Sequence, residues 1–308
     1  MKVLVFGSSG LVGSSLKRVL GKSKTFENIF FSSRKDTDLS SVISTKNTIS
    51  DFKPNIIINA AAKVGGIVAN NTQRTSFLLD NLKINMNILE SLMEINNTKV
   101  INLGSSCIYP LNAKNPISED EFMNGKLEPT NSPYAMAKIT AIELGNAIKN
   151  EYGHTVINLM PTNLYGPNDN FSEQDSHVIP GLLRKMHEAK INNDNVFNIW
   201  GSGLPLREFL YVDDLAKAIK FIIEESIEDE LINVGSGKEI SILELSKKIQ
   251  NTVNYLGDLQ FDKTMPDGNP RKLLDSSKIN SFGWYSETDL DTGLKNTYDW
   301  FLNNSPRL

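Results

Sequence analysis

Short apolar runs alternate with longer amphipathic stretches through the first half of the chain. Five runs are mainly apolar, at residues 3–6, 29–31, 55–60, 100–103 and 155–159. Between them, the apolar residues of 11–20 and 72–96 recur at helical spacing. Strands that are apolar on both faces and alternate with helices are typical of a parallel sheet covered by helices on both sides. The pattern therefore predicts a doubly wound α/β fold.

A glycine-rich segment, GSSGLVG, follows the first apolar run and opens the first helical stretch. It places Gly7, Gly10 and Gly13 at G-x-x-G-x-x-G spacing. Glycines between a strand and a helix let the backbone approach a pyrophosphate at the helix N-terminus. We interpret this segment as a dinucleotide-binding turn. The alternative is a tight strand-to-helix turn that binds no ligand.

The pattern becomes irregular after about residue 165. Prolines interrupt it, and short strands separate the helices expected at 178–190, 213–225 and 241–251. We predict that residues 1–165 form a Rossmann-like domain that binds the dinucleotide and carries the catalytic residues. Residues 166–308 are predicted to form mainly a smaller α/β substrate-binding lobe, with some strands and helices returning to the first domain.

The end of the second apolar run bears on the choice of dinucleotide. The segment FFSSRKDTD places Arg34 close to this strand end, where a site for NAD usually has an acid that binds the ribose 2′-hydroxyl. An arginine there favours a 2′-phosphate, and thus NADP. Asp36 and Asp38 follow soon after, so NAD is the less favoured alternative. A solvated surface arginine is the other interpretation of Arg34.

Candidate catalytic residues lie at the end of the fourth apolar run and on a later helix. Tyr134 and Lys138 form Y-x-x-x-K, which puts both on one helix face. A neighbouring ammonium lowers the pKa of a phenol, so Tyr134 can donate a proton to a carbonyl that Ser105 orients. Ser105 and Cys107 are two residues apart, and a continuing strand would point both into one pocket. The alternative for Cys107 is packing as a small apolar residue.

Composition argues against several classes of partner. The 308-residue chain has a net charge of −4 and a pI near 5.6, which disfavours nucleic acid. One cysteine and three scattered histidines indicate neither an internal disulfide nor a metal cluster. Without a run of roughly 20 apolar residues, no membrane span is expected. The N-terminal MKVLVFG is interpreted as a first strand and not as a signal peptide, so a cytoplasmic location is expected.

The glycine turn, SSC and YAMAK together resemble the extended short-chain dehydrogenase/reductase family. Within it, the chain is similar over nearly its whole length to the GDP-L-fucose synthase branch. The similarity lies in the blocks AAAKVGGIVANN (60–71), LGSSCIYP (103–110), EPTNSPYAMAK (128–138), MPTNLYGPNDNF (160–171), SHVIPGLLRKMHEA (176–189), WGSGLPLREFLYVDDLA (200–216) and PDGNPRKLLD (266–275).

The resemblance implies a substrate and roles for particular residues. Such enzymes epimerise C3 and C5 of GDP-4-keto-6-deoxy-D-mannose and then reduce C4 with NADPH. By the resemblance, Cys107 and His177 exchange the protons beside the ketone, Ser105 and Tyr134 hold its oxygen, and Lys138 completes the catalytic group. NADP would contact Gly7, Gly10, Leu11, Val12, Gly13, Arg34, Leu39, Lys138, Asn163, Leu164 and His177. The GDP sugar would contact Asn163, Lys185, Trp200, Arg207 and Lys272.

Two positions depart from the family pattern. Ser9 stands where many relatives carry an arginine that touches the 2′-phosphate, so NADP binding would depend on Arg34. Lys185 stands where an arginine is usual, and lysine cannot make the same bidentate contact. Relatives usually dimerise through a four-helix bundle that includes the Y-x-x-x-K helix, so we expect a homodimer.

Three alternatives stay open to different degrees. A C4 reductase of a related GDP-4-keto sugar, such as a 6-deoxy-heptose, would look nearly the same in sequence. A nucleotide-sugar 4,6-dehydratase normally has an acidic pair soon after the catalytic Ser or Thr, and this chain has Cys-Ile there. A non-catalytic nucleotide-binding protein is disfavoured because Ser105, Tyr134 and Lys138 are all present.

Overall fold

A six-stranded parallel sheet forms the centre of the larger part of the molecule. In this computed structural model, which describes residues 1–26, 28–95, 98–173, 175–265 and 267–306, the strand order is β2-β1-β3-β4-β5-β9. All five strand pairs in the sheet are parallel. The strands are β1 (Lys2–Phe6), β2 (Asn28–Ser32), β3 (Ile56–Asn59), β4 (Lys99–Leu103), β5 (Thr155–Pro161) and β9 (Leu231–Val234).

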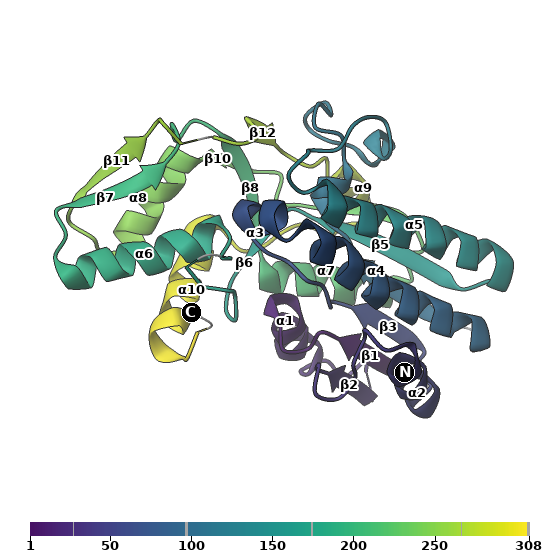
Figure 1. Cartoon of the computed structure of the whole chain (residues 1–308). Helices are drawn as coiled ribbons and strands as arrows, with labels where there is room; N and C mark the ends of the chain where they lie inside the picture. Colours follow the sequence, from purple (N-terminus) through teal and green to yellow (C-terminus); the bar gives the residue numbers. More distant parts are fainter. Residues whose placement is uncertain (27, 96–97, 174, 266, 307–308) are drawn as a thin grey trace.

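Helices cover both faces of this sheet (Figure 1). Val3 and Val5 of β1 point toward the face covered by α1 (Leu11–Leu20) and α7 (Val212–Glu224). Leu4 and Phe6 point toward the opposite face, under the helices α2 (Val42–Phe52), α4 (Arg74–Glu90) and α5 (Ser132–Tyr152). Every residue from Val3 to Phe6 is fully buried, which is why β1 is continuously apolar. The doubly wound, Rossmann-like fold predicted from the sequence is confirmed.

The helical stretch expected at 72–96 is divided. It consists of α3 (Ile67–Thr72), α4 and a short 3₁₀ helix at Ser91–Glu94. The break falls at Gln73, whose φ of −112° and ψ of 34° leave the helical range. Asn96, the expected end of the stretch, lies outside the described residues. Residues 70–76 are all polar, so the apolar pattern does not locate the break.

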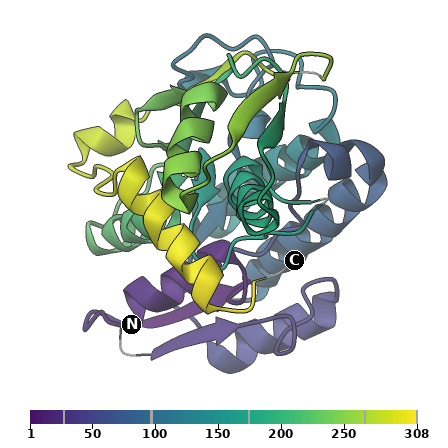
Figure 2. The same ribbon diagram turned by 90° about the vertical axis from the view of Figure 1, so that its left-hand side faces the viewer.

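A smaller lobe is built mainly from the second half of the chain. Its core packs α6 (Val178–Asn192), α8 (Ile242–Val253) and α10 (Leu290–Asn303) against the paired strands β7 (Val196–Trp200) and β11 (Asp258–Asp262). Helices α8 and α10, green and yellow in Figure 2, lie on the side of the lobe that faces the viewer. A second sheet joins the lobe to the larger part, with β6 (Asn163–Tyr165), β8 (Leu206–Tyr211), β10 (Glu239–Ser241) and β12 (Arg271–Lys272).

The chain crosses between the two parts more than once. After the lobe begins, α7 returns to pack on α1, and β9 becomes the edge strand of the six-stranded sheet beside β5. The short helix α9 (Ser277–Ser281) packs against β9. Residues 166–308 therefore contribute both to the lobe and to the Rossmann-like part.

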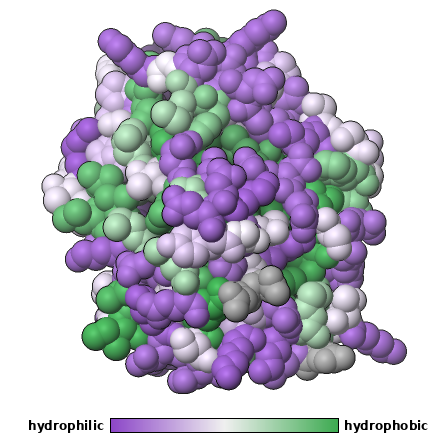
Figure 3. Space-filling model, turned by 90° about the vertical axis from the view of Figure 1, so that its right-hand side faces the viewer, coloured by the Kyte–Doolittle hydropathy of each residue, from purple (hydrophilic) through white to green (hydrophobic). Residues whose placement is uncertain are grey.

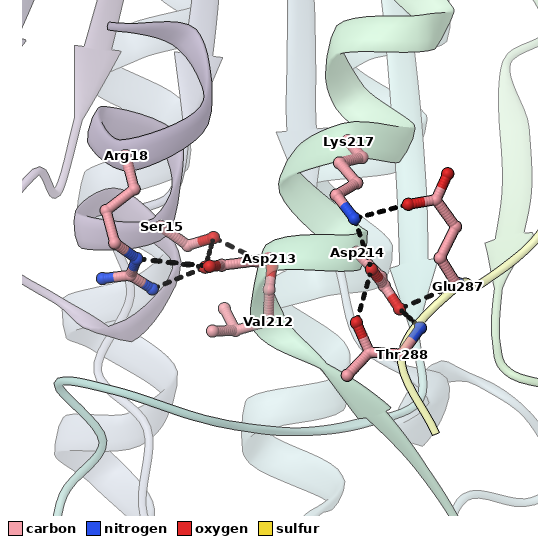
Figure 4. A network of polar contacts seen from close by, with 8 residues as sticks. All are labelled: Ser15, Arg18, Val212, Asp213, Asp214, Lys217, Glu287 and Thr288. Atoms are coloured by element: carbon pink, nitrogen blue, oxygen red, sulfur yellow. Dashed lines mark hydrogen bonds and ion pairs between the residues drawn. The ribbon is translucent and has the colours of Figure 1, made fainter. Parts of the chain in front are cut away.

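Two adjacent acids at the start of α7 tie these parts together (Figure 4). Asp213 accepts hydrogen bonds from the Ser15 hydroxyl at 2.6 Å and from the Arg18 guanidinium at 2.6 Å, both on α1. Asp214 points the other way and accepts from the Thr288 backbone N–H at 2.7 Å and the Thr288 hydroxyl at 3.0 Å. Acids are favourable at a helix N-terminus in any case, because the helix dipole is positive there.

The outer surface is mainly polar, as the polar and charged residues of the sequence lead us to expect. Figure 3, which views the side at the right of Figure 1, shows mainly hydrophilic residues with apolar residues in separate patches. Among the residues that the structure describes, no helix combines the length and the apolar character that a membrane crossing requires.

We predict that Asp214→Ala destabilises the protein by about 2–4 kcal/mol, because it removes a buried acceptor from three partly buried donors. Asp214 is only 1 % exposed and also accepts from the Glu287 N–H at 3.1 Å. The matched control is Asp291→Ala, which removes an exposed ion pair with Lys248 and is expected to cost less than about 1 kcal/mol. Urea unfolding of both variants measures the difference. Equal unfolding midpoints for the two variants would contradict the stabilising role given to Asp214.

Candidate active site

The glycine turn between β1 and α1 contains glycines of two kinds. Gly7 has a φ of +78°, and a Cβ there would lie 2.7 Å from the Ala61 nitrogen. A Cβ on Gly13 would collide with the Gly7 carbonyl. These two glycines are required by the turn itself, with or without a ligand.

Gly10 is different, because neither its backbone conformation nor its neighbours require glycine. Its φ is −82°, and a Cβ would meet only the Gly7 oxygen at 3.5 Å. The space in front of α1 is thus kept free of side-chain atoms. No side chain caps the helix there, so the N–H groups of its first turn are available to an anion. This arrangement fits a dinucleotide pyrophosphate.

The end of β2 lies next to this turn. The Ser8 N–H donates to the Ser32 carbonyl at 3.1 Å, and the Ser8 hydroxyl donates to the Phe31 carbonyl at 3.2 Å. Arg34 follows and is exposed. Asp36 and Asp38 turn back onto their own loop, where Asp36 accepts from the Ser33 hydroxyl and Asp38 from the Ser40 hydroxyl. Hydrogen bonding to Ser33 lowers the pKa of Asp36. This arrangement favours Arg34 over either acid as the group that meets the ribose.

Ser105 and Cys107 are brought together, but not in the way expected from the sequence. Strand β4 ends at Leu103, so the alternation of a continuing strand does not apply. Instead Ser105 caps a short 3₁₀ helix at Ser106–Ile108, and its Oγ accepts the Cys107 N–H at 3.3 Å. The turn after β4 therefore holds the hydroxyl and the buried thiol close to each other.

Helix α5 carries Tyr134 and Lys138 to the same strand end. The Lys138 ammonium donates to the Leu103 carbonyl at 2.7 Å and lies 5.8 Å from the centre of the Tyr134 ring. The edge of Phe77 on α4 meets the Tyr134 ring with the two centroids 6.3 Å apart. The serine thus comes from the turn after β4, and the tyrosine and lysine come from α5. Phe77 is a supporting contact that sequence reasoning missed.

Burial determines the protonation of these side chains. From the sequence, Lys138 is expected to lower the pKa of Tyr134, but in the structure the pKa of Tyr134 is raised instead. Burial raises the pKa of Tyr134 above its usual value, and it lowers the pKa of Lys138 to about 8. The Lys138 ammonium bonds to a backbone carbonyl and lies over the tyrosine ring, so desolvation outweighs its attraction for a phenolate. Burial also raises the pKa of Cys107, although Lys272, Ser105 and Lys138 oppose it. Tyr134 and Cys107 are therefore protonated at neutral pH.

Two cations lie side by side, and one of them, Lys272, is close enough to the Cys107 thiol to oppose the rise in its pKa. Arg207 of β8 and Lys272 of β12 are partners in the parallel strand register. Burial lowers the pKa of Lys272, the positive charge of Arg207 adds to this effect, and the charges of Cys107 and Glu128 oppose it. Glu128 is a second residue that sequence reasoning missed. The feature that could have identified Glu128 is its place at the start of EPTNSPYAMAK, six residues before Tyr134.

The remaining expected substrate and cofactor residues come from further elements. Trp200 is 62 % exposed, and the Lys185 ammonium lies 5.7 Å from the centre of its ring. His177 precedes α6 and is exposed as a residue, but the protein packed around its imidazole desolvates the ring and lowers the imidazole pKa. Asn163 is exposed on β6. The expected apolar cofactor contacts Leu11, Val12, Leu39 and Leu164 are all partly buried.

The fold and the site together define a dinucleotide-dependent enzyme that acts on a carbonyl or hydroxyl carbon. The glycine turn is the expected cofactor end, and Ser105, Tyr134 and Lys138 are the expected proton-transfer group. The model of the NAD dependent epimerase/dehydratase family matches residues 3–235, and the chain belongs to this family. The resemblance to the extended short-chain dehydrogenases is confirmed.

Relatives within the family are similar over nearly the whole chain. GDP-L-fucose synthase 1 of Arabidopsis thaliana is 46 % identical, with 98 % of this chain and 94 % of the relative aligned. GDP-L-fucose synthase of Escherichia coli is 43 % identical, with 99 % and 98 % aligned.

Two solved structures have the same fold. A GDP-L-fucose synthetase from Naegleria fowleri bound to NADP has a TM-score of 0.91 at 30 % identity, covering 100 % of this chain and 96 % of the other. A GDP-6-OMe-4-keto-L-xylo-heptose reductase from C. jejuni has a TM-score of 0.90 at 31 % identity, covering 98 % and 97 %.

We predict that Arg34→Ala weakens NADPH binding by about tenfold or more and leaves NADH binding nearly unchanged, because only NADPH has the 2′-phosphate. Lys22→Ala is the control, since Lys22 is exposed just beyond the far end of α1. Fluorescence titration of wild type and both variants with each dinucleotide gives the six dissociation constants. An equal loss for NADPH and NADH would show that Arg34 does not read the 2′-phosphate.

Proposed function

We propose that this protein converts GDP-4-keto-6-deoxy-D-mannose to GDP-L-fucose, by epimerising C3 and C5 and reducing C4 with NADPH. The observation that carries the proposal is the position of Cys107. A reductase needs the serine, tyrosine and lysine, but a second proton-transfer group beside the serine is what epimerisation adds. The relatives at 46 % and 43 % identity support the same reaction and substrate.

Epimerisation uses the acidity of the carbons that flank the ketone. Ser105 and Tyr134 donate hydrogen bonds to the ketone oxygen, where negative charge develops as a proton leaves C3 or C5. Cys107 and His177 supply the proton exchange, one removing a proton and the other returning one to the opposite face. Because burial raises the thiol pKa and the surrounding protein lowers the imidazole pKa, both groups are uncharged near neutral pH.

Reduction uses the same oxygen-binding group. NADPH, when bound along the glycine turn, supplies the hydride to C4. Tyr134 then gives its proton to the C4 oxygen, and the raised pKa of its phenol means that the proton is present at neutral pH. Lys138 and the Leu103 carbonyl fix the position of the tyrosine helix against β4.

Recognition of the GDP sugar is divided between the two parts of the chain. Residues 1–165 hold the dinucleotide and most of the catalytic group, and residues 166–308 supply the cations Lys185, Arg207 and Lys272. Arg207 and Lys272 neutralise the diphosphate. Trp200 stacks on guanine, with its exposed ring as the supporting observation. A cytoplasmic location belongs to the same proposal, because a catalytic thiol must stay reduced.

The second candidate is a C4 reductase of a related GDP-4-keto sugar such as a 6-deoxy-heptose. The fold similarity to the C. jejuni heptose reductase favours it. In that case Cys107 and His177 are retained without taking part in proton exchange.

Isotope exchange tests the main proposal against the second candidate. The protein is incubated with GDP-4-keto-6-deoxymannose in deuterated water, first without and then with NADPH. We expect deuterium at C3 and C5 and a GDP-L-fucose product. Cys107→Ser should lose most of the labelling. Tyr134→Phe should lose about 10²–10⁴-fold in reduction rate and still bind NADPH. Reduction without label, or turnover only with a heptose analogue, would reject the proposal.

We further propose a homodimer formed through α4 and α5, which pack side by side in Figure 1. Leu79 and Met86 on α4 and Met136 on α5 are each about half exposed, at 46 %, 45 % and 46 %. Leu79 and Met86 are seven residues apart, so they lie on the same face of the helix. An apolar stripe of this kind on two adjacent helices suits a four-helix bundle with a second copy.

We expect the double variant Leu79→Glu, Met86→Glu to be monomeric, because four carboxylates would be buried at the twofold interface. Light scattering coupled to size exclusion measures the mass. Leu256→Glu is the control, since Leu256 is 92 % exposed in the other lobe. A wild-type protein that elutes as a monomer, or a double variant that stays dimeric, would refute this interface.

A further inference from the structure

Glu208 is a fully buried carboxylate in the middle of β8. Its oxygens accept the backbone N–H of Gly237 at 2.7 Å and the backbone N–H of Leu274 at 3.1 Å. Burial raises its pKa, and these N–H groups oppose the rise. Burying a carboxyl group is costly unless its oxygens are hydrogen-bonded. The mechanism above makes no use of Glu208, so its presence calls for another explanation.

The neighbour of Glu208 in β8 is Arg207, one of the two cations assigned to the diphosphate. Successive side chains of a strand point to opposite faces, so Arg207 and Glu208 point away from each other. Lys272 pairs with Arg207 in the strand register, which places the two cations side by side. Like charges directly opposite each other in a sheet are destabilising, so the pair must be held by other contacts.

Two hydrogen bonds hold β12 against β8 around the cation pair, and Glu208 accepts one of them. The Leu206 N–H donates to the Pro270 carbonyl at 2.9 Å, and the Leu274 N–H donates to the Glu208 carboxylate. In the sequence, Lys272 lies midway between Pro270 and Leu274, and Arg207 lies between Leu206 and Glu208. The two hydrogen bonds therefore fall on either side of the cation pair. The carboxylate therefore holds β12 in register with β8 at the point where the two cations meet.

Two further segments converge on the same residue. The Glu208 backbone carbonyl accepts the side-chain amide of Asn163 at 2.8 Å and the Thr162 hydroxyl at 3.2 Å. The turn between β9 and β10 packs so closely that a Cβ on Gly235 would collide with the Glu208 carboxylate. One buried residue thus contacts the segments that carry Asn163, Arg207 and Lys272, which all belong to the expected substrate site.

We propose that Glu208 is a positioning residue for the diphosphate of the nucleotide sugar, and that its carboxylate sets the spacing of Arg207 and Lys272. This inference rests on the proposed function, because it takes these cations as the diphosphate site. Glutamine at this position would keep one oxygen acceptor but turn an amide N–H₂ toward a backbone donor. Aspartate would keep the charge but fall one methylene short of spanning both N–H groups.

The test measures ligand binding to full-length Glu208→Gln and Glu208→Asp with two probes, GDP and NADPH, by calorimetry. We expect both variants to bind GDP at least about tenfold more weakly than wild type, with the NADPH dissociation constant changed by less than about twofold. In turnover, KM for the nucleotide sugar should rise far more than kcat falls. Amide hydrogen exchange of residues 271–275 should become faster.

The matched control is Glu239→Gln. Glu239 faces Glu208 across β10 and β8, and its carboxylate accepts the Arg271 side chain at 2.8 Å in a partly exposed pair. Removing that charge should leave GDP binding within about twofold of wild type, because surface ion pairs contribute little.

Each outcome has a distinct meaning. Wild-type protein that fails to bind GDP would reject the diphosphate site itself, and the proposed function with it. GDP binding in wild type that survives in both Glu208 variants would overturn the positioning role alone. Equal losses of GDP and NADPH binding, or failure of both variants to fold, would show that Glu208 maintains the fold in general and would also overturn the inference.

Discussion

The meeting of three strand ends at one edge of the sheet is the constraint on which the site depends. Because β1, β3 and β4 are parallel neighbours, the turns that follow them emerge side by side. The turn after β1 carries the glycines, and its close packing against Ala61 after β3 leaves no room for a Cβ on Gly7. The turn after β4 carries Ser105 and Cys107. Cofactor and catalytic groups are therefore neighbours as a consequence of strand order.

Burial determines the chemistry of the groups placed at this edge. The Lys138 ammonium is almost completely buried, and its hydrogen bond to the Leu103 carbonyl compensates part of the lost hydration. Tyr134 and Cys107 stay protonated for the same reason, since desolvation disfavours their anions. The proposed reaction needs protons for an oxygen and for carbon, and burial keeps these two groups in the protonated form that it needs.

Buried or half-buried acids connect the parts of the molecule at places where the chain changes direction. Asp213 and Asp214 join α1 to the segment before α10 through opposite sides of one helix start. Glu208 joins β8 to β12 and to the β9–β10 turn. In each case the acid accepts donors from segments far apart in sequence, so it stabilises an arrangement that no single segment could hold. The proposed reaction does not use these acids, and we propose that they keep the cofactor helix and the expected substrate cations in place.

The sequence by itself determined the elements and the kind of site. Continuous apolar runs predicted the buried parallel strands, because a strand covered on both faces has no polar side, and the glycine spacing predicted the turn at β1. The Y-x-x-x-K spacing placed Tyr134 and Lys138 on one helix face, since four residues make about one helical turn. These features are local, and local periodicity is what a sequence displays directly.

Only the tertiary structure decided the contacts between distant segments and the charges that result from them. It showed that Ser105 reaches Cys107 through a 3₁₀ turn and not along a strand, and that burial outweighs Lys138 in setting the pKa of Tyr134. It also brought Glu208 against Leu274, 66 residues away. A desolvation energy depends on every atom around a group, and those atoms come from all parts of the chain. For this reason the sequence indicated which residues could do the chemistry, and the packed fold decided their protonation and their partners.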